Sequence, residues 1–456
     1  MVKSRIKLFL SMIMAFSLLL VVACSNENTD SDADSNGLEE GESNTVEPEE
    51  GTEDATTLSL WTFVAYHQDH FEYMVERWNE ENPNEQIKLE MTNYPFEEMH
   101  NKLLIALQSG VGAPDFANIE IKQWSKFLQG SEEDISLEPL NDMVEPILDN
   151  AVEARFTNYS KDGNYYGIPT QVAATVMYYN KEMMNEAEVD PMSIETWDDF
   201  VEAGLKVKDA TGKPMTTVES ADTWTFWPII SQRGSDLIDE AGNVIVDNEI
   251  NTETLQFLSD MVHEHEIAIP APGGNHSAEE FFGFFSDGGA ASVMMPAWYM
   301  SRFRDYMPDM AGNIEIAPMP AWEKGGARSA GMGGTGTALT NQSEHKDLAK
   351  RFLEYAKLSE EGSIALWTIL GSEPPRWDVW DKPEMSEDNE FTELFGNDIF
   401  EKLSTIRDDI NPINITDDSS RAIDLVSNQL LYNVIREGQD VEEGIKKVAD
   451  EIRDSQ

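Results

Sequence analysis

The sequence is poor in cysteine and in basic residues. Cys24 is the only cysteine among 456 residues, which excludes an intramolecular disulfide, a catalytic thiol in the folded part and a cysteine cluster for zinc. Only 32 Lys or Arg stand against 86 Asp or Glu, a net charge of −54. Negative charge on this scale repels phosphate backbones, so the sequence predicts no nucleic-acid partner.

Residues 25–56 are almost without apolar side chains and contain twelve Asp or Glu but no Lys or Arg. Such a segment cannot bury enough surface to offset its conformational entropy, which predicts a disordered, self-repelling tether over residues 24–56. The chain beyond it still holds 74 acids and 29 bases, a net charge of −45. We interpret this acidity as a solvated surface suited to saline or alkaline surroundings.

The first 24 residues have the layout of a secretory signal peptide. Three basic residues precede an apolar run from Leu8 to Val22, which is too short for a comfortable membrane span. The end of this segment, Val-Val-Ala-Cys at 21–24, resembles the lipobox of bacterial lipoproteins, in which the cysteine becomes the first residue of the mature chain and is acylated. The resemblance implies a signal peptide over 1–23, lipidation of Cys24 and anchoring to the membrane on the extracellular face of the cell.

The sequence has no complete catalytic motif, and stretches that look like one lack the secondary structure or spacing that the motif requires. The stretch 331–336 fits G-x-G-x-x-G, but the dinucleotide motif must follow a strand and open a helix, whereas Thr337–Thr340 has a strand pattern. We interpret this stretch as a hinge crossing. His263-Glu-His265-Glu is not H-E-x-x-H, and its two histidines point to different faces of a helix. The sequence therefore predicts no metal site and no cofactor.

Beyond residue 56 the predicted elements alternate. The stretch 57–63 has a strand pattern and 71–78 a helical one, and the same order repeats at 87–91 and 99–107. Strand-helix-strand-helix order predicts an α/β fold, and about 400 residues suit two lobes. Ligands of such sheets bind at the carboxyl ends of strands. These ends carry five candidate ligand-binding residues: Phe63, His67, Asn93, Tyr94 and Glu120.

The stretch 164–180 predicts a crossing between the lobes. It reads as two short extended segments joined at a bend that contains Gly167 and Pro169. We expect this segment to form part of a hinge, with Thr170 and Gln171 facing the cleft.

Aromatic residues stand beside polar ones at several predicted strand ends. A sugar has apolar faces for stacking and hydroxyls for polar partners, so this mixture is typical of a sugar site. The candidates from these stretches are Asp222, Trp224, Trp298, Tyr299 and Arg376. For any one tryptophan, core packing remains the alternative, and we assign Trp78 and Trp197 to the core.

Together these motifs resemble the extracellular sugar-binding lipoproteins of ABC importers. The resemblance covers nearly the whole mature chain and rests on Leu58-Ser-Leu-Trp-Thr-Phe63, Pro114-Asp115, Tyr166-Gly-Ile-Pro-Thr170, Asn180-Lys-Glu-Met183, Trp197-Asp-Asp-Phe200, Trp227-Pro228, the stretch 289–298 and the stretch 371–380. The stretches 210–215, 269–274 and 374–380 are most similar to the arabino-oligosaccharide-binding lipoproteins of Gram-positive bacteria.

The resemblance implies an α/β fold of the periplasmic-binding-protein type (type II), with two lobes joined by three crossings. The implied division is a signal peptide over 1–23, a tether over 24–56, the N-terminal lobe over 57–167 and 331–373, and the C-terminal lobe over 168–330 and 374–456, the last with the C-terminal helices. By position, Trp298 matches the tryptophan that stacks on sugar in this family, and Asp222 and Trp224 match an acidic and aromatic pair.

The expected function is that of a monomeric, non-enzymatic receptor. It would trap an arabinan-derived oligosaccharide by hinge closure and deliver it to the permease subunits of an ABC importer. The alternative is a secreted glycoside hydrolase acting on plant-wall oligosaccharides, which needs two carboxylates at a fixed distance, one with a raised pKa. Carboxylates are too plentiful here for a pair to be chosen. A cell-wall adhesin would need exposed repeats or a sorting signal, and neither is visible.

Overall fold

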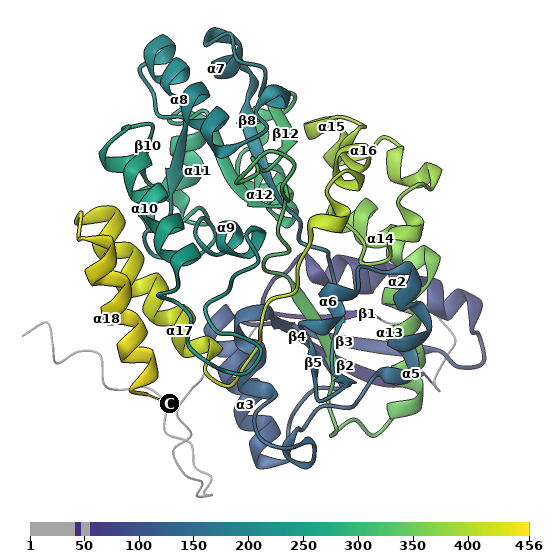
Figure 1. Ribbon diagram of the computed structural model, residues 1–456. Helices are drawn as coiled ribbons and strands as arrows, with labels where there is room; N and C mark the ends of the chain where they lie inside the picture. The colour runs from purple at the N-terminus through teal and green to yellow at the C-terminus, as the bar shows by residue number, and fades with distance from the viewer. Residues whose placement is uncertain (1–41, 47–54, 456) are drawn as a thin grey trace, which may run out of the picture. The chain divides into compact units, whose positions relative to one another are not determined.

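Two lobes, each built around its own β-sheet, make up the part of the chain that the structure describes (Figure 1). The structure is a computed structural model and describes residues 42–46 and 55–455. The expected signal peptide, Cys24 and most of the expected tether lie outside these residues. No helix within them is long and apolar enough to cross a membrane.

The first lobe contains a six-stranded sheet with the order β1-β3-β2-β4-β13-β7. Its strands are β1 (Glu42–Val46), β2 (Thr56–Thr62), β3 (Ile87–Asn93), β4 (Phe116–Glu120), β7 (Ile168–Pro169) and β13 (Thr335–Leu339). The central strands β3, β2 and β4 are parallel, as the alternation of strand and helix predicts. β1 and β13 are antiparallel to their neighbours.

Two of these strands lie differently from the expected division. β1 pairs with β3 from Glu42 to Val46, so five residues of the segment expected to be a disordered tether form an edge strand. Backbone hydrogen bonds make this pairing, so it does not require an apolar alternation in the sequence. β7 pairs with β13, so residues 168 and 169 lie with the first sheet although the expected boundary falls at 168.

Helices from distant parts of the sequence cover the first sheet. They are α2 (His67–Glu81), α3 (Phe96–Ser109), α4 (Trp124–Phe127), α5 (Asn141–Val144), α6 (Glu153–Thr157), α13 (Lys346–Leu358) and α14 (Glu360–Leu370). The short strands β5 (Ser160–Lys161) and β6 (Asn164–Tyr165) form a hairpin. Trp78 of α2 packs its ring edge-on against Phe352 and Tyr355 of α13, which confirms its assignment to the core.

The second lobe contains the antiparallel sheet β11-β8-β12 and a parallel pair, β10-β9. The strands are β8 (Thr175–Asn180), β9 (Thr216–Val218), β10 (Ala268–Pro270), β11 (Ser292–Pro296) and β12 (Ile314–Pro318). β8 is buried at every residue because it is the central strand and helices cover its faces.

The helices of the second lobe include the C-terminal ones. They are α7 (Lys181–Glu186), α8 (Trp197–Thr211), α9 (Trp227–Gln232), α10 (Glu249–His263), α11 (Glu279–Ser286), α12 (Met300–Tyr306), α15 (Glu390–Phe395), α16 (Ile399–Ser404), α17 (Ser419–Leu425), the π-helix η11 (Val426–Arg436) and α18 (Val441–Arg453). Single turns of 3₁₀ helix include η1 (Ile121–Gln123) and η6 (Ala297–Tyr299).

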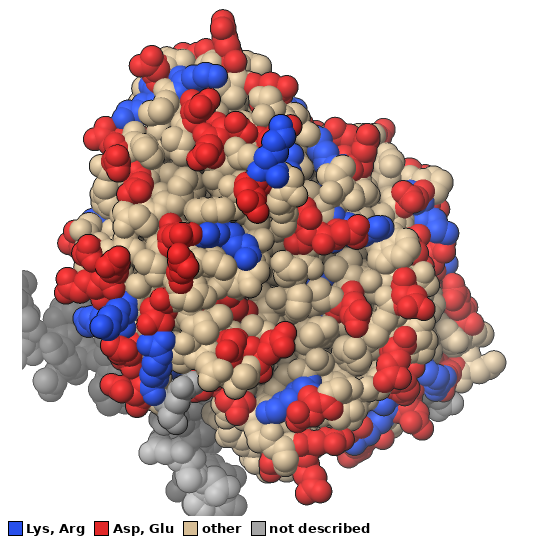
Figure 2. Space-filling model, viewed as in Figure 1, with Lys and Arg blue, Asp and Glu red and all other residues tan. Residues whose placement is uncertain are grey.

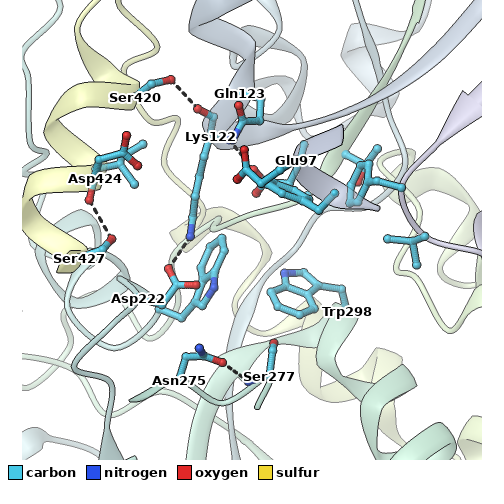
Figure 3. A pocket seen from close by; sticks show the side chains of 18 of the residues that line it. Glu97, Lys122, Gln123, Asp222, Asn275, Ser277, Trp298, Ser420, Asp424 and Ser427 are labelled. Atoms are coloured by element: carbon cyan, nitrogen blue, oxygen red, sulfur yellow. Dashed lines mark hydrogen bonds and ion pairs between the residues drawn. The ribbon is translucent and has the colours of Figure 1, made fainter. Parts of the chain in front are cut away.

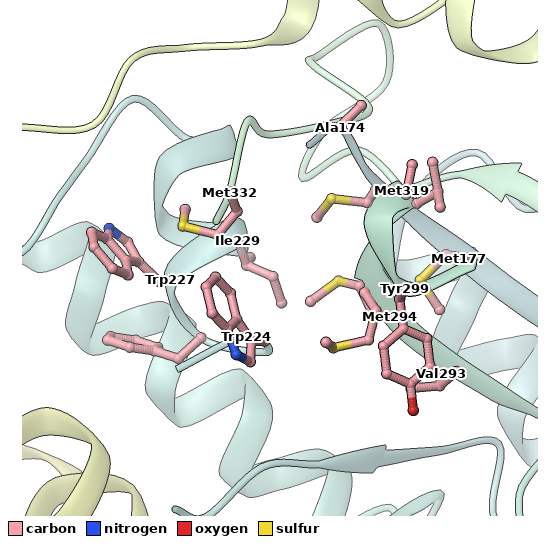
Figure 4. Close-up of a cluster of buried hydrophobic side chains, with 14 of the residues drawn as sticks. Ala174, Met177, Trp224, Trp227, Ile229, Val293, Met294, Tyr299, Met319 and Met332 are labelled. Atoms are coloured by element: carbon pink, nitrogen blue, oxygen red, sulfur yellow. The ribbon is translucent and has the colours of Figure 1, made fainter. Parts of the chain in front are cut away.

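Buried side chains of the second lobe form a continuous layer behind the cleft (Figure 4). Met177 of β8 and Met294 of β11 face Trp227 and Ile229 of α9 across this layer. In Figure 4 Trp224 is drawn between Trp227 and Met294, and it is 6% exposed. The layer therefore fixes the segment around Trp224 from behind.

Three crossings connect the lobes side by side, and this confirms the expected number. They run between β7 and β8, between β12 and β13, and between α14 and the 3₁₀ turn at Trp377–Val379. Val172 donates its N–H to the carbonyl of Glu373 at 2.9 Å, and Met332 donates to the carbonyl of Ala173 at 2.9 Å. Backbone hydrogen bonds thus join all three crossings into one hinge.

The surface is strongly acidic. In Figure 2, Asp and Glu side chains are spread over the whole visible face, and the fewer Lys and Arg side chains stand among them. Many Lys and Arg side chains of the described chain pair with acids, as in the ion pairs Lys208–Glu266 and Lys382–Glu360. The visible acids therefore outnumber the bases that could neutralise them.

Candidate functional site

A cavity of about 550 Å³ lies where the two lobes face each other (Figure 3). Its volume is within the usual range for a small-molecule site. The structure brings seven of the residues expected from the sequence to its wall: Phe63, His67, Glu120, Gln171, Asp222, Trp224 and Trp298. Residues from both lobes and from the hinge therefore share one cavity.

Four expected residues do not line this cavity. Tyr94 packs against Trp61 at the end of β3, next to Asn93. Tyr299 is fully buried, and its hydroxyl donates to the carbonyl of His276 at 2.5 Å. Arg376 donates to the carboxylate of Asp378 and to the carbonyl of Leu358 at 2.6 Å, so it holds the third crossing in place.

The first lobe contributes an aromatic part of the wall around Phe63 and His67. The ring of Phe63 stands edge-on to His67 and Phe96. Nδ1 of His67 lies 3.2 Å from the hydroxyl of Thr62, and burial lowers the pKa of His67 to about 3. His67 is therefore neutral and can exchange hydrogen bonds with a neutral ligand.

Glu120 is the last residue of β4, and its side chain bonds to the backbone that follows it. Its carboxylate accepts the N–H of Lys122 at 2.9 Å and so caps η1. Burial raises the pKa of Glu120 to about 7, although the nearby Lys122 ammonium opposes this shift. The residue can thus act as a hydrogen-bond acceptor or donor near neutral pH.

Two tryptophans form the wall of the second lobe. The rings of Trp224 and Trp298 meet edge to face, with centroids 5.6 Å apart at 76°. Gly333 of the second crossing has φ +78, and a Cβ there would lie 2.9 Å from Nε1 of Trp298 and 3.0 Å from the Trp224 ring. Only glycine lets the backbone of the crossing pack this closely against both rings. This packing accounts for glycine at position 333, so no phosphate-binding role is needed to explain it.

An ion pair spans the cavity from lobe to lobe. Nζ of Lys122 lies 2.5 Å from the carboxylate of Asp222 and 3.9 Å from the centroid of the Trp224 ring. Burial alone would lower the pKa of Lys122, but Asp222 and Glu120 outweigh it and raise the pKa. The ammonium therefore stays charged and covers one face of Trp224.

Glu219 lies behind the second-lobe wall and holds two of its loops. Its carboxylate is fully buried and accepts the N–H of Trp224 at 2.8 Å and the N–H of His276 at 2.9 Å. The first loop carries Asp222, and the second carries Asn275, which also lines the cavity. One carboxylate thus sets the spacing of both loops.

Sequence reasoning missed Lys122, Glu219 and Arg302. Lys122 follows the strand end at Glu120 by two residues, and Glu219 directly follows β9, so the strand-end rule could have found both. Arg302 lies four residues beyond Trp298, one helical turn on, and lines the same cavity. Within the described residues there is no group of three His, Cys, Asp or Glu placed to hold a metal ion.

The family model of bacterial extracellular solute-binding proteins matches residues 65–362, which contain large parts of both lobes and two of the crossings. The chain belongs to this family. Solute-binding proteins of this family act outside the cytoplasmic membrane, so the protein is extracellular.

Two relatives of this solute-binding protein cover nearly its whole length. An arabinooligosaccharide-binding protein of Halalkalibacterium halodurans is 54% identical over 401 residues, 88% of this chain and 89% of that protein. An arabinooligosaccharide-binding protein of Bacillus subtilis is 46% identical over 411 residues, 90% of this chain and 94% of that protein.

Solved structures of other solute-binding proteins share the fold. The sugar-binding protein MalE of Xanthomonas citri superposes with a TM-score of 0.74 at 20% identity, over 88% of this chain and 97% of that one. A binding protein of B. animalis subsp. lactis in complex with beta-1,6-galactobiose gives 0.71 at 20% identity, over 88% and 98%. These likenesses confirm the type II periplasmic-binding-protein fold that the sequence predicts.

Proposed function

We propose that this protein is the receptor of an ABC importer and that it captures an arabinan-derived oligosaccharide. The observation that carries the proposal is the cavity wall, where the half-buried Trp298 ring shares one cavity with Lys122 and Asp222, which come from opposite lobes. An aromatic face next to charged hydrogen-bonding groups suits the apolar faces and hydroxyls of a sugar. The relatives that cover most of the chain bear the name arabinooligosaccharide-binding protein, which favours this sugar.

Closure of the two lobes around the sugar completes the proposed mechanism. Contacts from both lobes to one ligand favour the closed state, and a permease that binds this state receives a loaded receptor. We propose that the protein acts as a monomer, has no enzymatic activity and needs no cofactor. A lipid on Cys24 would hold it at the extracellular face of the membrane, with the acidic segment between Cys24 and β1 as its tether.

Titration calorimetry with pentose and hexose oligosaccharides tests the proposed function. We expect saturable binding of arabino-oligosaccharides that is tighter than binding of matched hexose chains. Chromatography of the ligand after prolonged incubation distinguishes the receptor from a glycoside hydrolase. Recovery of intact sugar supports the receptor, whereas shortened chains would establish the hydrolase.

A further inference from the structure

We propose that the Lys122–Asp222 ion pair divides the cavity into two compartments and so determines which oligosaccharide length binds best. The inference rests on the proposed function, because it takes the ligand to be a sugar chain. Lys122 comes from η1 of the first lobe, and Asp222 comes from the loop after β9 of the second lobe. Their side chains meet in the middle of the cavity (Figure 3).

The first compartment, here the Trp298 compartment, lies on one side of the pair. Trp298 lies on this side of Lys122 in Figure 3, and Phe63, Gln171 and Arg302 line the same cavity. Trp298 is half-buried and offers an aromatic ring, whereas Trp224 is 6% exposed and has the Lys122 ammonium over its face. Stacking is therefore available on Trp298 while the ion pair is closed.

The second compartment, here the α17 compartment, lies on the other side of Lys122 in Figure 3. Ser420, Asp424, Ser427 and Asn428 line it from α17 and η11. Their spacing places them on one face of this continuous helical stretch, and Asp424 and Asn428 are exposed. A face of hydroxyl, carboxylate and amide groups, without an aromatic ring, suits the hydroxyls of a further sugar unit.

The pair can open without moving the backbone of Lys122. The carbonyl of Lys122 accepts the hydroxyl of Ser420 at 2.8 Å, which fixes the main chain at the start of α17. Only the side chain crosses the cavity, and it is 15% exposed. Rotation of this side chain would join the compartments and uncover the face of Trp224.

Opening is unfavourable because the two charges are largely buried. A sugar in the Trp298 compartment can bond to the pair through its hydroxyls while the pair stays closed. A longer chain must displace the ammonium from both Asp222 and Trp224 before it reaches the α17 compartment. The wild-type protein should therefore gain little affinity from the units that extend beyond the pair.

Calorimetry with arabino-oligosaccharides from the disaccharide upward tests this barrier. In the wild type we expect affinity to rise with length and then to level off. In Lys122→Ala the side chain that crosses the cavity is gone, so the ratio of long-chain to short-chain affinity should rise about tenfold. Asp222→Asn keeps the shape but removes one charge, so the ratio should move in the same direction.

Two control variants localise the effect. Glu266→Gln removes one carboxylate from the exposed Lys208–Glu266 pair outside the cavity and should leave the ratio unchanged. Adding Asp424→Ala to Lys122→Ala should abolish the gain for long chains, since the gain comes from the α17 compartment. Thermal melts check that each variant folds. If Lys122→Ala does not fold, the affinity ratio of Asp222→Asn is compared with that of the wild type instead.

The inference would be overturned if affinity depended on oligosaccharide length in the same way in the wild type, Lys122→Ala and Asp222→Asn. The proposed function would still stand. A gain that survives Asp424→Ala would also overturn the inference, because the extra units would then bind elsewhere. If the wild type binds no member of the series, the proposed function itself fails, and the inference fails with it.

Discussion

Trp298 and Trp367 carry the same side chain in opposite surroundings, which makes them a matched pair for mutation. Trp298 is half-buried in the cavity wall, whereas Trp367 of α14 is fully buried between Phe391 and Phe400. Trp298→Ala should lower sugar affinity roughly ten- to a hundredfold with near-normal melting, because burial of an aromatic face contributes about 1.5–3 kcal/mol. Trp367→Ala should instead cost about 3–5 kcal/mol of stability.

Calorimetry and thermal melts on both variants separate recognition from packing. Unaltered affinity in Trp298→Ala, or a collapse of its melting temperature to that of Trp367→Ala, would show that Trp298 serves only the core.

Glu219 does not line the cavity but holds two loops that do, so its mutation tests whether the position of these loops affects binding. In Glu219→Gln one amide N–H faces a backbone N–H, so one of the two loops loses its hydrogen bond. Affinity should fall about tenfold, with a stability loss of about 1–3 kcal/mol. Asp236→Asn is the control, because Asp236 is also buried and also accepts backbone N–H groups, but away from the cavity. It should lose stability and keep its affinity.

The pH dependence of Glu219 has a defined sign. Burial, and then the neighbouring Asp222, raise its pKa above the ordinary value of 4.5. Its contribution to stability is therefore complete below about pH 4.5 and is lost as pH rises through the raised pKa. The stability deficit of Glu219→Gln should shrink over this rise in urea titrations. A deficit that is constant with pH would mean that folding does not raise the pKa of Glu219.

The sequence identifies residue types at this scale but not side-chain directions. Trp298 and Tyr299 are adjacent, and both fit the sugar pattern, yet one lines the cavity and the other points into the core. Arg376 fits the pattern too, but Asp378, two residues on, binds it. Direction depends on the local turn and on distant partners, and neither is local in sequence.

At the scale of elements, helix caps show the same limit. Thr196 and Asp199 have the spacing of a capping box in the sequence, and they form that box at the start of α8. Ser277 and Glu280 have the same spacing, but α11 begins at Glu279 and has no side-chain cap. The N–H of Ser277 instead bonds to the side chain of Asn275 at 2.9 Å, so a competing turn replaces the box.

Lys357 links α13 to the hinge and predicts a pH effect on stability. Its buried Nζ bonds to the hydroxyl of Thr170 at 2.6 Å, and His67 and His70 of α2, both neutral, lie near it. Burial lowers the pKa of Lys357 to about 7. A lowered lysine pKa gives stability that is complete above about 10.5 and is lost as pH falls through about 7.

Lys357→Met removes this buried charge and should stabilise the protein at neutral pH by on the order of 1–3 kcal/mol. The gain should shrink as pH rises from about 7 towards about 10.5. Lys350→Met on the same helix is the control and should show no such trend, because Lys350 is partly exposed. Urea denaturation at several pH values measures both, and destabilisation at neutral pH would mean that the Thr170 bond outweighs the burial of charge.

At the scale of the whole molecule, Cys24 predicts where the protein resides. Cys24→Ser should release it from the cell surface, because the lipid can no longer be attached, and should leave sugar affinity unchanged. Fractionation of cells into membrane and medium, with calorimetry on the released protein, measures both effects. Unchanged retention in the membrane fraction would contradict lipidation at this residue.

The two-lobed fold was predictable at this scale because strand-helix alternation and the motif order are spread along the chain. The closure of the cavity was not. The ion pair between Lys122 and Asp222 joins residues a hundred positions apart, on different lobes. Only the folded crossings bring them together, and no local pattern encodes that distance.

The acidity of the chain predicts a salt response of the whole molecule. Residues 57–456 carry a net charge of −45, so like charges repel one another more in the compact state than in the unfolded chain. The Debye length falls from about 30 Å at 0.01 M to about 10 Å at 0.1 M salt, which screens this repulsion. The melting temperature should therefore rise with sodium chloride across this range.

Near pH 4, where carboxylates begin to take up protons, this rise of the melting temperature with salt should be smaller. Scanning calorimetry at both pH values measures it, and a flat or falling curve near neutral pH would mean that surface ion pairs, which salt weakens, outweigh the repulsion.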